Sequence, residues 1–167
     1  ANEMRERLYA RTPQAGRMTI STIHSMCALI LRMDGEQLGY RRNFSIYSDN
    51  DSERVLKRLF KELGFDDKQF PPRSVLGYIS RAKDAMKLAE EYLAECEKAG
   101  DFRLTKIAKV YVEYQRRLWE ASALDFDDII LHTVELLQSD RQTLEYYRNK
   151  FRYVLIDEYQ DTNHMQY

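Results

Sequence analysis

The stretch Phe151-Arg-Tyr-Val-Leu-Ile-Asp-Glu-Tyr-Gln-Asp161 carries the clearest fold signal in this chain of 167 residues. Its apolar run, Tyr153 to Ile156, is too short for a helix and is typical of a strand that is covered on both faces. Asp157 and Glu158 follow at the carboxyl end of this predicted strand, where open parallel sheets bind their ligands. The stretch therefore predicts a buried strand that delivers two adjacent carboxylates to a site.

Two carboxylates at the end of a buried strand lose hydration, and a bound Mg²⁺ ion would compensate for that loss. In phosphoryl transfer one acid holds the Mg²⁺ that bridges the β- and γ-phosphates, and a neighbouring group orients the attacking water. On this interpretation Asp157 holds the metal, Glu158 is the general base and Gln160 senses the γ-phosphate. The alternative is structural, with Asp157 capping the next helix and Glu158 simply solvated.

The longer string from Val154 to Asn163 reads Val-Leu-Ile-Asp-Glu-Tyr-Gln-Asp-Thr-Asn and is far more specific than two carboxylates alone. It resembles the DExQ Walker B box of the UvrD/Rep family of superfamily-one DNA helicases. The resemblance implies Mg²⁺ and ATP as cofactors, and it assigns Asp157, Glu158 and Gln160 to the nucleotide site.

A second motif, Thr22-Ile-His-Ser25, lies where a predicted strand meets a predicted helix. From the residues alone, its threonine or serine caps the helix and its histidine is a hydrogen-bonded structural residue. The motif is similar to the Thr-Phe-His-Ser sequence with which the family contacts single-stranded DNA, so Thr22, His24 and Ser25 become candidate DNA contacts. Ile23 replaces the usual Phe, which leaves a stacking role at this position open.

A third motif, Leu124-Asp-Phe-Asp-Asp128, precedes an apolar helical segment. Asp125 and Asp128 form an N-cap pair that complements the helix dipole, and this structural role is the default interpretation. The pentapeptide also resembles one that is characteristic of the UvrD/Rep family. We therefore expect it to support family membership without forming a catalytic site.

The remaining pattern predicts a mainly α fold with a small parallel β component. Residues 18–22 alternate like a short strand, and apolar residues at helical spacing predict helices over residues 21–38, 49–63, 74–86, 88–99, 104–122 and 141–149. The resemblance implies that residues 1–43 and 124–167 belong to a partial RecA-like α/β core, domain 1A. Residues 44–123 would form a helical bundle inserted into that core, similar to the family's 1B subdomain.

Basic residues of the predicted bundle would be available to the phosphates of single-stranded or duplex DNA. They are Arg54, Lys57, Arg58, Lys68, Arg73, Arg81 and Lys83. Solvated helix faces carry the same residue types for solubility, so no single one of them is assigned to DNA. The formal net charge of −1 adds no nucleic-acid signal of its own.

Composition also bears on the cellular compartment. Cys27 and Cys96 are isolated in helical contexts, which indicates reduced thiols in a cytoplasmic protein. No apolar run approaches the length that spans a membrane, so no membrane partner is expected.

The glycines show no phosphate-binding loop. A P-loop needs G-x-x-x-x-G-K-[ST], and the six glycines, at positions 16, 35, 39, 64, 77 and 100, include no such pattern. The resemblance implies that this loop lies upstream and the second RecA-like domain downstream, in missing helicase domains of the same polypeptide. We therefore expect a fragment of an ATP-dependent DNA helicase that has no ATPase activity alone.

Two other classes of function stay open at this point. Asp157, Glu158 and Asp161 could hold the metals of a metal-dependent nuclease. The helical portion could instead be a non-catalytic module that binds DNA or protein.

Overall fold

The computed structural model describes residues 2–12, 16, 18–157, 159 and 162. Within these residues the protein is mainly helical and has one two-stranded parallel sheet, which confirms a mainly α fold with a small parallel β component. In chain order the elements are α1 (Asn2–Tyr9), α2 (Ile23–Asp34), the 3₁₀ helix η2 (Gly35–Leu38), β1 (Ser45–Ile46), α3 (Asp49–Leu63), α4 (Pro72–Asp84), α5 (Ala89–Ala99), α6 (Phe102–Glu120), β2 (Ala123–Leu124), α7 (Phe126–Ser139) and α8 (Arg141–Lys150).

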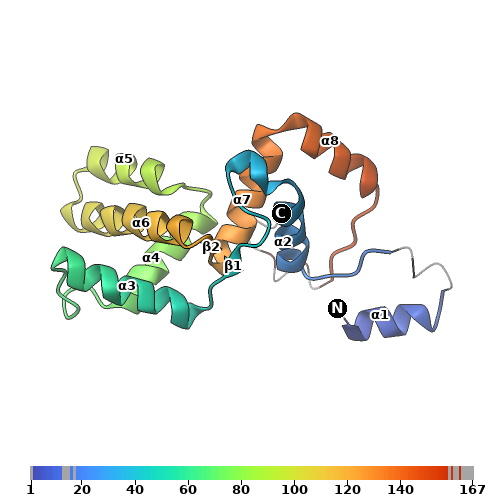
Figure 1. Ribbon diagram of the computed structural model, residues 1–167, viewed down its shortest axis with the longest axis horizontal. Coiled ribbons are helices and arrows are strands. Elements are labelled where there is room, and N and C mark those ends of the chain that lie inside the picture. The colour runs from blue at the N-terminus through green and yellow to red at the C-terminus, as the bar shows by residue number, and fades with distance from the viewer. Residues whose placement is uncertain (1, 13–15, 17, 158, 160–161, 163–167) are drawn as a thin grey trace.

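Helices α3 to α6 form a bundle at one end of the molecule, and α1 lies at the opposite end (Figure 1). The bundle encloses an apolar core whose members recur at helical spacing, for example Leu56, Leu59 and Phe60 on α3 and Ile107, Tyr111, Tyr114 and Leu118 on α6. Local signals set the ends of α3 as the sequence predicts. Ser48 and Asp51 form a capping box at its start, and Gly64 ends it with a φ of 66°.

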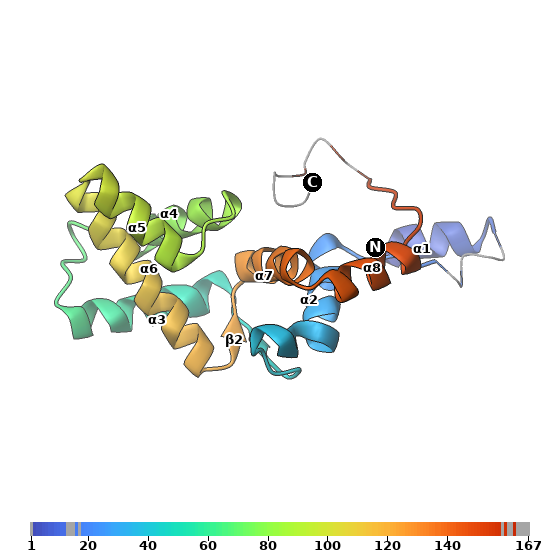
Figure 2. The same cartoon turned by 90° about the horizontal axis from the view of Figure 1, so that it is seen from above.

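A second apolar core lies between α2, α7 and α8, with buried residues that include Leu31, Ile130 and Leu136. Side-chain hydrogen bonds join the same helices. Thr133 Oγ1 donates to the Cys27 carbonyl at 3.3 Å, and Tyr147 Oη donates to Asp34 Oδ2 at 2.7 Å. Figure 2 shows α7 lying between the bundle and α8, so α7 is the helix that faces both halves of the molecule.

The small sheet forms where the chain crosses between the two cores. Strands β1 and β2 pair in parallel, with Ser45 opposite Ala123 and Ile46 opposite Leu124. The sequence predicts only an extended connector at β1 and nothing at β2. Two residues per strand carry too little pattern to be read, and their pairing depends on segments almost eighty positions apart.

Neither strand that the sequence does predict is formed within the described residues. Residues 18–22 lead into α2 without pairing, and residues 153–156 run in the open. Tyr153, Val154 and Leu155 are 92%, 70% and 98% exposed. A strand needs hydrogen-bonding neighbours on its edges, and the described part of the chain places none beside these two segments.

The start of α4 also differs from the prediction. The sequence predicts a helix that starts at residue 74, but α4 begins at Pro72, where a missing N–H is harmless at the first helical position. The helix ends at Asp84, and Met86 lies beyond it with a φ of 58°. Val75, Ile79 and Ala82 lie on its inward face and are buried.

Cys27 and Cys96 are both buried free thiols. Among the residues that the structure describes, no helix combines the length and the apolar character needed to cross a membrane.

Candidate functional site

The carboxylate segment lies after α8, on the outside of the molecule. Asp157 is exposed at a bend in the chain, and Thr162 donates from its N–H and its hydroxyl to the Tyr159 carbonyl, at 3.1 and 2.7 Å. Glu158 and Gln160 lie outside the described residues, as does Asp161. Their predicted roles as general base, γ-phosphate sensor and nuclease ligand therefore stay predictions.

The donor chemistry of Asp157 suits a Mg²⁺ ion. Mg²⁺ usually takes one or two carboxylates, keeps several waters and binds phosphate oxygens of the substrate. An exposed carboxylate with room for water fits this donor set. Among the described residues there is no group of three or more His, Cys, Asp or Glu side chains that could enclose a metal ion by themselves.

The Thr22 to Ser25 motif forms the start of α2. Thr22 is the N-cap, and its Oγ1 accepts from the Ser25 N–H at 3.2 Å and lies 2.8 Å from Ser25 Oγ. The capping role that the residues alone suggest is therefore confirmed. Thr22 and Ser25 are exposed, so their hydroxyls at the start of α2 can reach a phosphate.

His24 is half-buried and meets a residue from the third motif. Its ring lies edge-on to the Phe126 ring, with centroids 5.6 Å apart and an interplanar angle of 67°. Phe126 is the first residue of α7, so the starts of α2 and α7 lie side by side. The structure thus brings the second and third motifs together.

The Leu124 to Asp128 motif caps α7, as predicted. Asp125 Oδ1 accepts from the Asp128 N–H at 2.9 Å, and Asp128 Oδ2 accepts from the Asp125 N–H at 3.1 Å, which completes a capping box. Both carboxylates are buried, and Asp128 is completely enclosed. Buried charges of one sign need a partner, which the motif itself does not contain.

That partner is Lys83 at the end of α4. Its Nζ lies 2.6 Å from Asp125 Oδ2 and 2.7 Å from Asp128 Oδ1, and the side chain is fully buried. The prediction that Lys83 is available to DNA phosphates is therefore wrong. Lys83 lies on the inward face of α4, one turn after Ile79, and two acidic residues from another helix neutralise it there.

Two residues of α6 complete the cluster from the bundle side. Tyr114 Oη donates to Asp125 Oδ2 at 2.9 Å, and Gln115 Nε2 donates to Asp128 Oδ1 at 2.9 Å. The Lys83 ammonium also lies over the Tyr114 ring, 5.4 Å from its centroid. Three side chains of the bundle thus hold the first turn of α7.

Burial and neighbouring charges shift the pKa values of Asp125, Asp128 and Lys83, and the direction of the net shift differs between these residues. Burial, reinforced by the like charge of Asp128, raises the pKa of Asp125 to about 6. Burial also acts to raise the pKa of Asp128, but Lys83 and His132 outweigh it and hold that pKa below its usual value. For Lys83, burial lowers the pKa while Asp128 and Asp125 raise it, and the net shift is upward.

His132 continues the cluster one turn further along α7. Its Nδ1 lies 2.7 Å from Glu135 Oε2, and its Nε2 lies 3.6 Å from Asp128 Oδ1. Burial acts to lower the pKa of His132, but the carboxylates of Asp128 and Glu135 raise it to about 9. The imidazolium is therefore the stable form at neutral pH.

Sequence reasoning missed Lys83 and His132 as partners of the third motif. One signal was present for Lys83, because residues 75, 79, 82 and 83 share one face of a helix. For His132, the spacing of four residues from Asp128 on one helix was the available signal.

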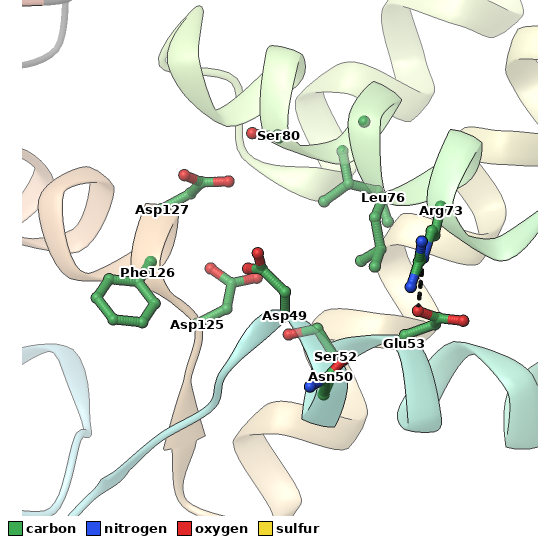
Figure 3. Close-up of a pocket in the computed structure, with 12 residues that line it drawn as sticks. Asp49, Asn50, Ser52, Glu53, Arg73, Leu76, Ser80, Asp125, Phe126 and Asp127 are labelled. Carbon is green, nitrogen blue, oxygen red and sulfur yellow. Dashed lines mark hydrogen bonds and ion pairs between the residues drawn. The ribbon is translucent and has the colours of Figure 1, made fainter.

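A cavity of about 550 Å³ opens beside the cluster, between α3, α4 and the start of α7. Asp49, Glu53, Asp125 and Asp127 line it, together with Arg73, which pairs with Glu53 at 3.0 Å (Figure 3). Its carboxylates outnumber its one cation, so the cavity does not suit a phosphate or a DNA strand.

Comparison with known proteins shows that the chain is similar to one protein family over its whole length. The family model described as the UvrD/REP helicase N-terminal domain matches residues 1–167. The ATP-dependent DNA helicases PcrA of Staphylococcus epidermidis and Bacillus subtilis are both 44% identical to the chain over 168 aligned positions. The ATP-dependent DNA helicase UvrD1 of Mycobacterium tuberculosis is 46% identical over 169 positions.

These alignments cover all of this chain but only part of each relative. The chain spans 22–23% of the length of these three relatives.

Proposed function

The chain belongs to the UvrD/REP helicase family, and we propose that it forms part of the motor of an ATP-dependent DNA helicase. Such a motor couples ATP hydrolysis to movement along single-stranded DNA and to duplex unwinding. The observation that carries the proposal is a family match over residues 1–167, with relatives that are named ATP-dependent DNA helicases.

At the nucleotide end, Asp157 would hold a Mg²⁺ ion that neutralises the phosphates of ATP. Glu158 would accept the proton of the attacking water, and Gln160 would hydrogen-bond near the γ-phosphate. The exposure of Asp157 to solvent is in keeping with this assignment. The remaining phosphate contacts would come from other parts of the full-length protein.

At the DNA end, Thr22, His24 and Ser25 would contact single-stranded DNA from the start of α2. Exposed hydroxyls and the N–H groups of a helix start are suited to phosphate oxygens. We further propose that residues 44–123 act as an inserted helical subdomain, with residues 1–43 and 124–167 in the RecA-like domain. Two separate apolar cores joined through α7 are in keeping with this division.

The nucleotide assignment is tested by Asp157→Asn and Glu158→Gln in the full-length protein. Loss of the metal-side acid or of the general base is expected to lower DNA-stimulated ATP turnover by about 10²- to 10⁴-fold. Asp140→Asn is the matched control, because it removes a partly exposed carboxylate but keeps a good N-cap for α8. Near-normal turnover in both site variants would reject the assignment.

The 167-residue chain by itself separates the competing functions. We expect it to show no ATP hydrolysis, since it lacks the sequence of a phosphate-binding loop. Mg²⁺-dependent cleavage of DNA without ATP would support a nuclease instead. Binding of single-stranded DNA that weakens with salt, without any turnover, would identify a non-catalytic binding module.

A further inference from the structure

The first turn of α7 is attached to both halves of the molecule. On one side it is held by Lys83 of α4 and by Tyr114 and Gln115 of α6, all of which bond to Asp125 or Asp128. These bonds measure between 2.6 and 2.9 Å and lie in the interior. The position of this turn is therefore set from the bundle.

On the other side the same turn meets the start of α2. Phe126 stands between the two capping aspartates, and its ring lies against the His24 ring at 5.6 Å. In Figure 3 the Phe126 ring lies on the side of α7 away from Arg73 and Glu53. A hydrogen bond from Thr133 to the Cys27 carbonyl, at 3.3 Å, joins the two helices further along.

An ion cluster of this kind is better suited to setting geometry than to adding stability. Removing two carboxylates and an ammonium from water is costly, and well-packed apolar residues of similar volume are often as stable or more so. Hydrogen bonds differ from apolar packing because they fix both distance and direction. The fully buried Lys83 therefore orients the start of α7 with a specificity that an aliphatic side chain would not give.

We propose that Lys83 is a positioning residue for DNA binding, which sets the first turn of α7 so that Phe126 holds His24 at the DNA-facing start of α2. The inference rests on the proposed contact of Thr22, His24 and Ser25 with DNA. It adds a connection between the bundle and that contact, through a residue that touches no DNA itself. A displacement of the bundle would move Lys83 and the first turn of α7, and Phe126 would then displace His24.

The test measures ATP turnover of the full-length protein against the concentration of oligothymidylate. Lys83→Met is expected to raise the half-saturating DNA concentration about five- to tenfold, while the maximal rate changes less than about twofold. Lys87→Met is the matched control. Lys87 lies shortly after Lys83 in the chain and forms a partly exposed ion pair with Glu95. The control should leave both quantities unchanged.

Phe126→Leu tests the same path without disturbing the ion cluster, and it decides the matter if Lys83→Met does not fold. The Phe126 side chain is half-exposed, so this variant should fold normally. It should also raise the half-saturating DNA concentration. Combined with His24→Ala, Lys83→Met or Phe126→Leu should add nothing further, since all three act through one contact.

The outcomes separate this inference from the proposed function. If His24→Ala weakens DNA binding but Phe126→Leu and folded Lys83→Met do not, the positioning role is rejected and the DNA contact stands. Effects that simply add in the double variants would also reject it, because they would reflect general destabilisation. If His24→Ala leaves DNA binding unchanged, the proposed DNA contact itself is rejected.

Discussion

Lys83 shows how one residue can reverse its predicted role once its neighbours are known. On a helix surface it would be a solvated cation, but here it lies between Asp125 and Asp128 with no exposed surface. Removing one member of a buried ion cluster leaves the others without compensation. The stability of the fold should therefore depend on this side chain far more than on any surface lysine.

Lys83→Met is expected to lower the free energy of unfolding by about 3–5 kcal/mol, because two buried carboxylates lose their counter-charge. Urea denaturation followed by circular dichroism measures this change. Lys87→Met removes an ion pair in which both side chains are partly exposed. It should lower the free energy of unfolding by less than about 1 kcal/mol. Equal effects of the two substitutions would show that Lys83 is not buried as the structure describes.

His132 makes stability depend on pH between about 6.5 and 9. Asp128 and Glu135 raise its pKa to about 9. The Tyr40 ring lies against the His132 ring, with centroids 4.9 Å apart. A raised pKa means that the folded state binds the proton more tightly, so this stabilisation is present at low pH and is lost as pH rises through 9. The loss between pH 6.5 and pH 9 should amount to roughly 2–3 kcal/mol.

The measurement compares urea unfolding at pH 6.5 and pH 9 in the wild type and in His132→Asn. Other groups titrate in the same range, so the informative quantity is the difference between the two proteins. The variant should lose less stability than the wild type as pH rises. A slope that is the same in both proteins would remove His132 as its source.

At the scale of single elements, the sequence predicts a structural feature correctly when that feature depends on a few neighbouring residues. The caps of α2, α3 and α7 were predicted because Thr22, Ser48 and Asp125 each bond within three positions of themselves. The strands were not predicted correctly, because a strand is made by a partner that is distant in sequence. Residues 153–156 have the composition of a strand, but the described chain offers them no neighbour.

Two glycines make a matched test of how elements constrain single positions. Gly39 follows η2 with a φ of 84°, and an added Cβ would lie 2.5 Å from the Trp119 ring of α6. Gly77 is inside α4, and an added Cβ would meet nothing within 4 Å. Gly77→Ala should therefore stabilise the protein by about 0.5–1 kcal/mol, since alanine favours a helix.

Gly39→Ala should instead lower the melting temperature, because both its backbone conformation and the Trp119 ring oppose a side chain. The expected cost is more than about 1 kcal/mol. Thermal melts of the two variants give the comparison directly. A melting temperature for Gly39→Ala at or above that of the wild type would contradict the close approach of α6 to this turn.

At the scale of the whole molecule, the outstanding feature is the apolar run after α8. Tyr153, Val154 and Leu155 are all largely exposed, and they are consecutive. An exposed apolar segment with strand composition is a template for pairing with another chain. In a longer protein of this family we expect it to lie in a sheet.

The 167-residue chain alone is therefore expected to self-associate at micromolar concentrations. Light scattering should give a mass above the 19.9 kDa of one chain. Leu155→Lys should shift the protein towards the monomer, because a charge on the segment opposes pairing. Leu63→Lys, at a single half-exposed leucine at the end of α3, is the matched control and should leave the association unchanged. A monomeric wild type would contradict the prediction.

Features that depend on near neighbours can be predicted from the amino-acid sequence alone. These are the helices of the bundle, the caps of α2, α3 and α7, and the three ordered motifs by which the chain resembles its family. Helix packing, in contrast, is what buries Lys83, pairs β1 with β2 and brings Phe126 of the third motif against the second motif. The physical reason is distance along the chain, since Lys83 and Asp125 are 42 positions apart and no periodic pattern links them. Helical spacing and caps are encoded within one or two turns, whereas the partner of a buried charge is chosen by how the helices pack.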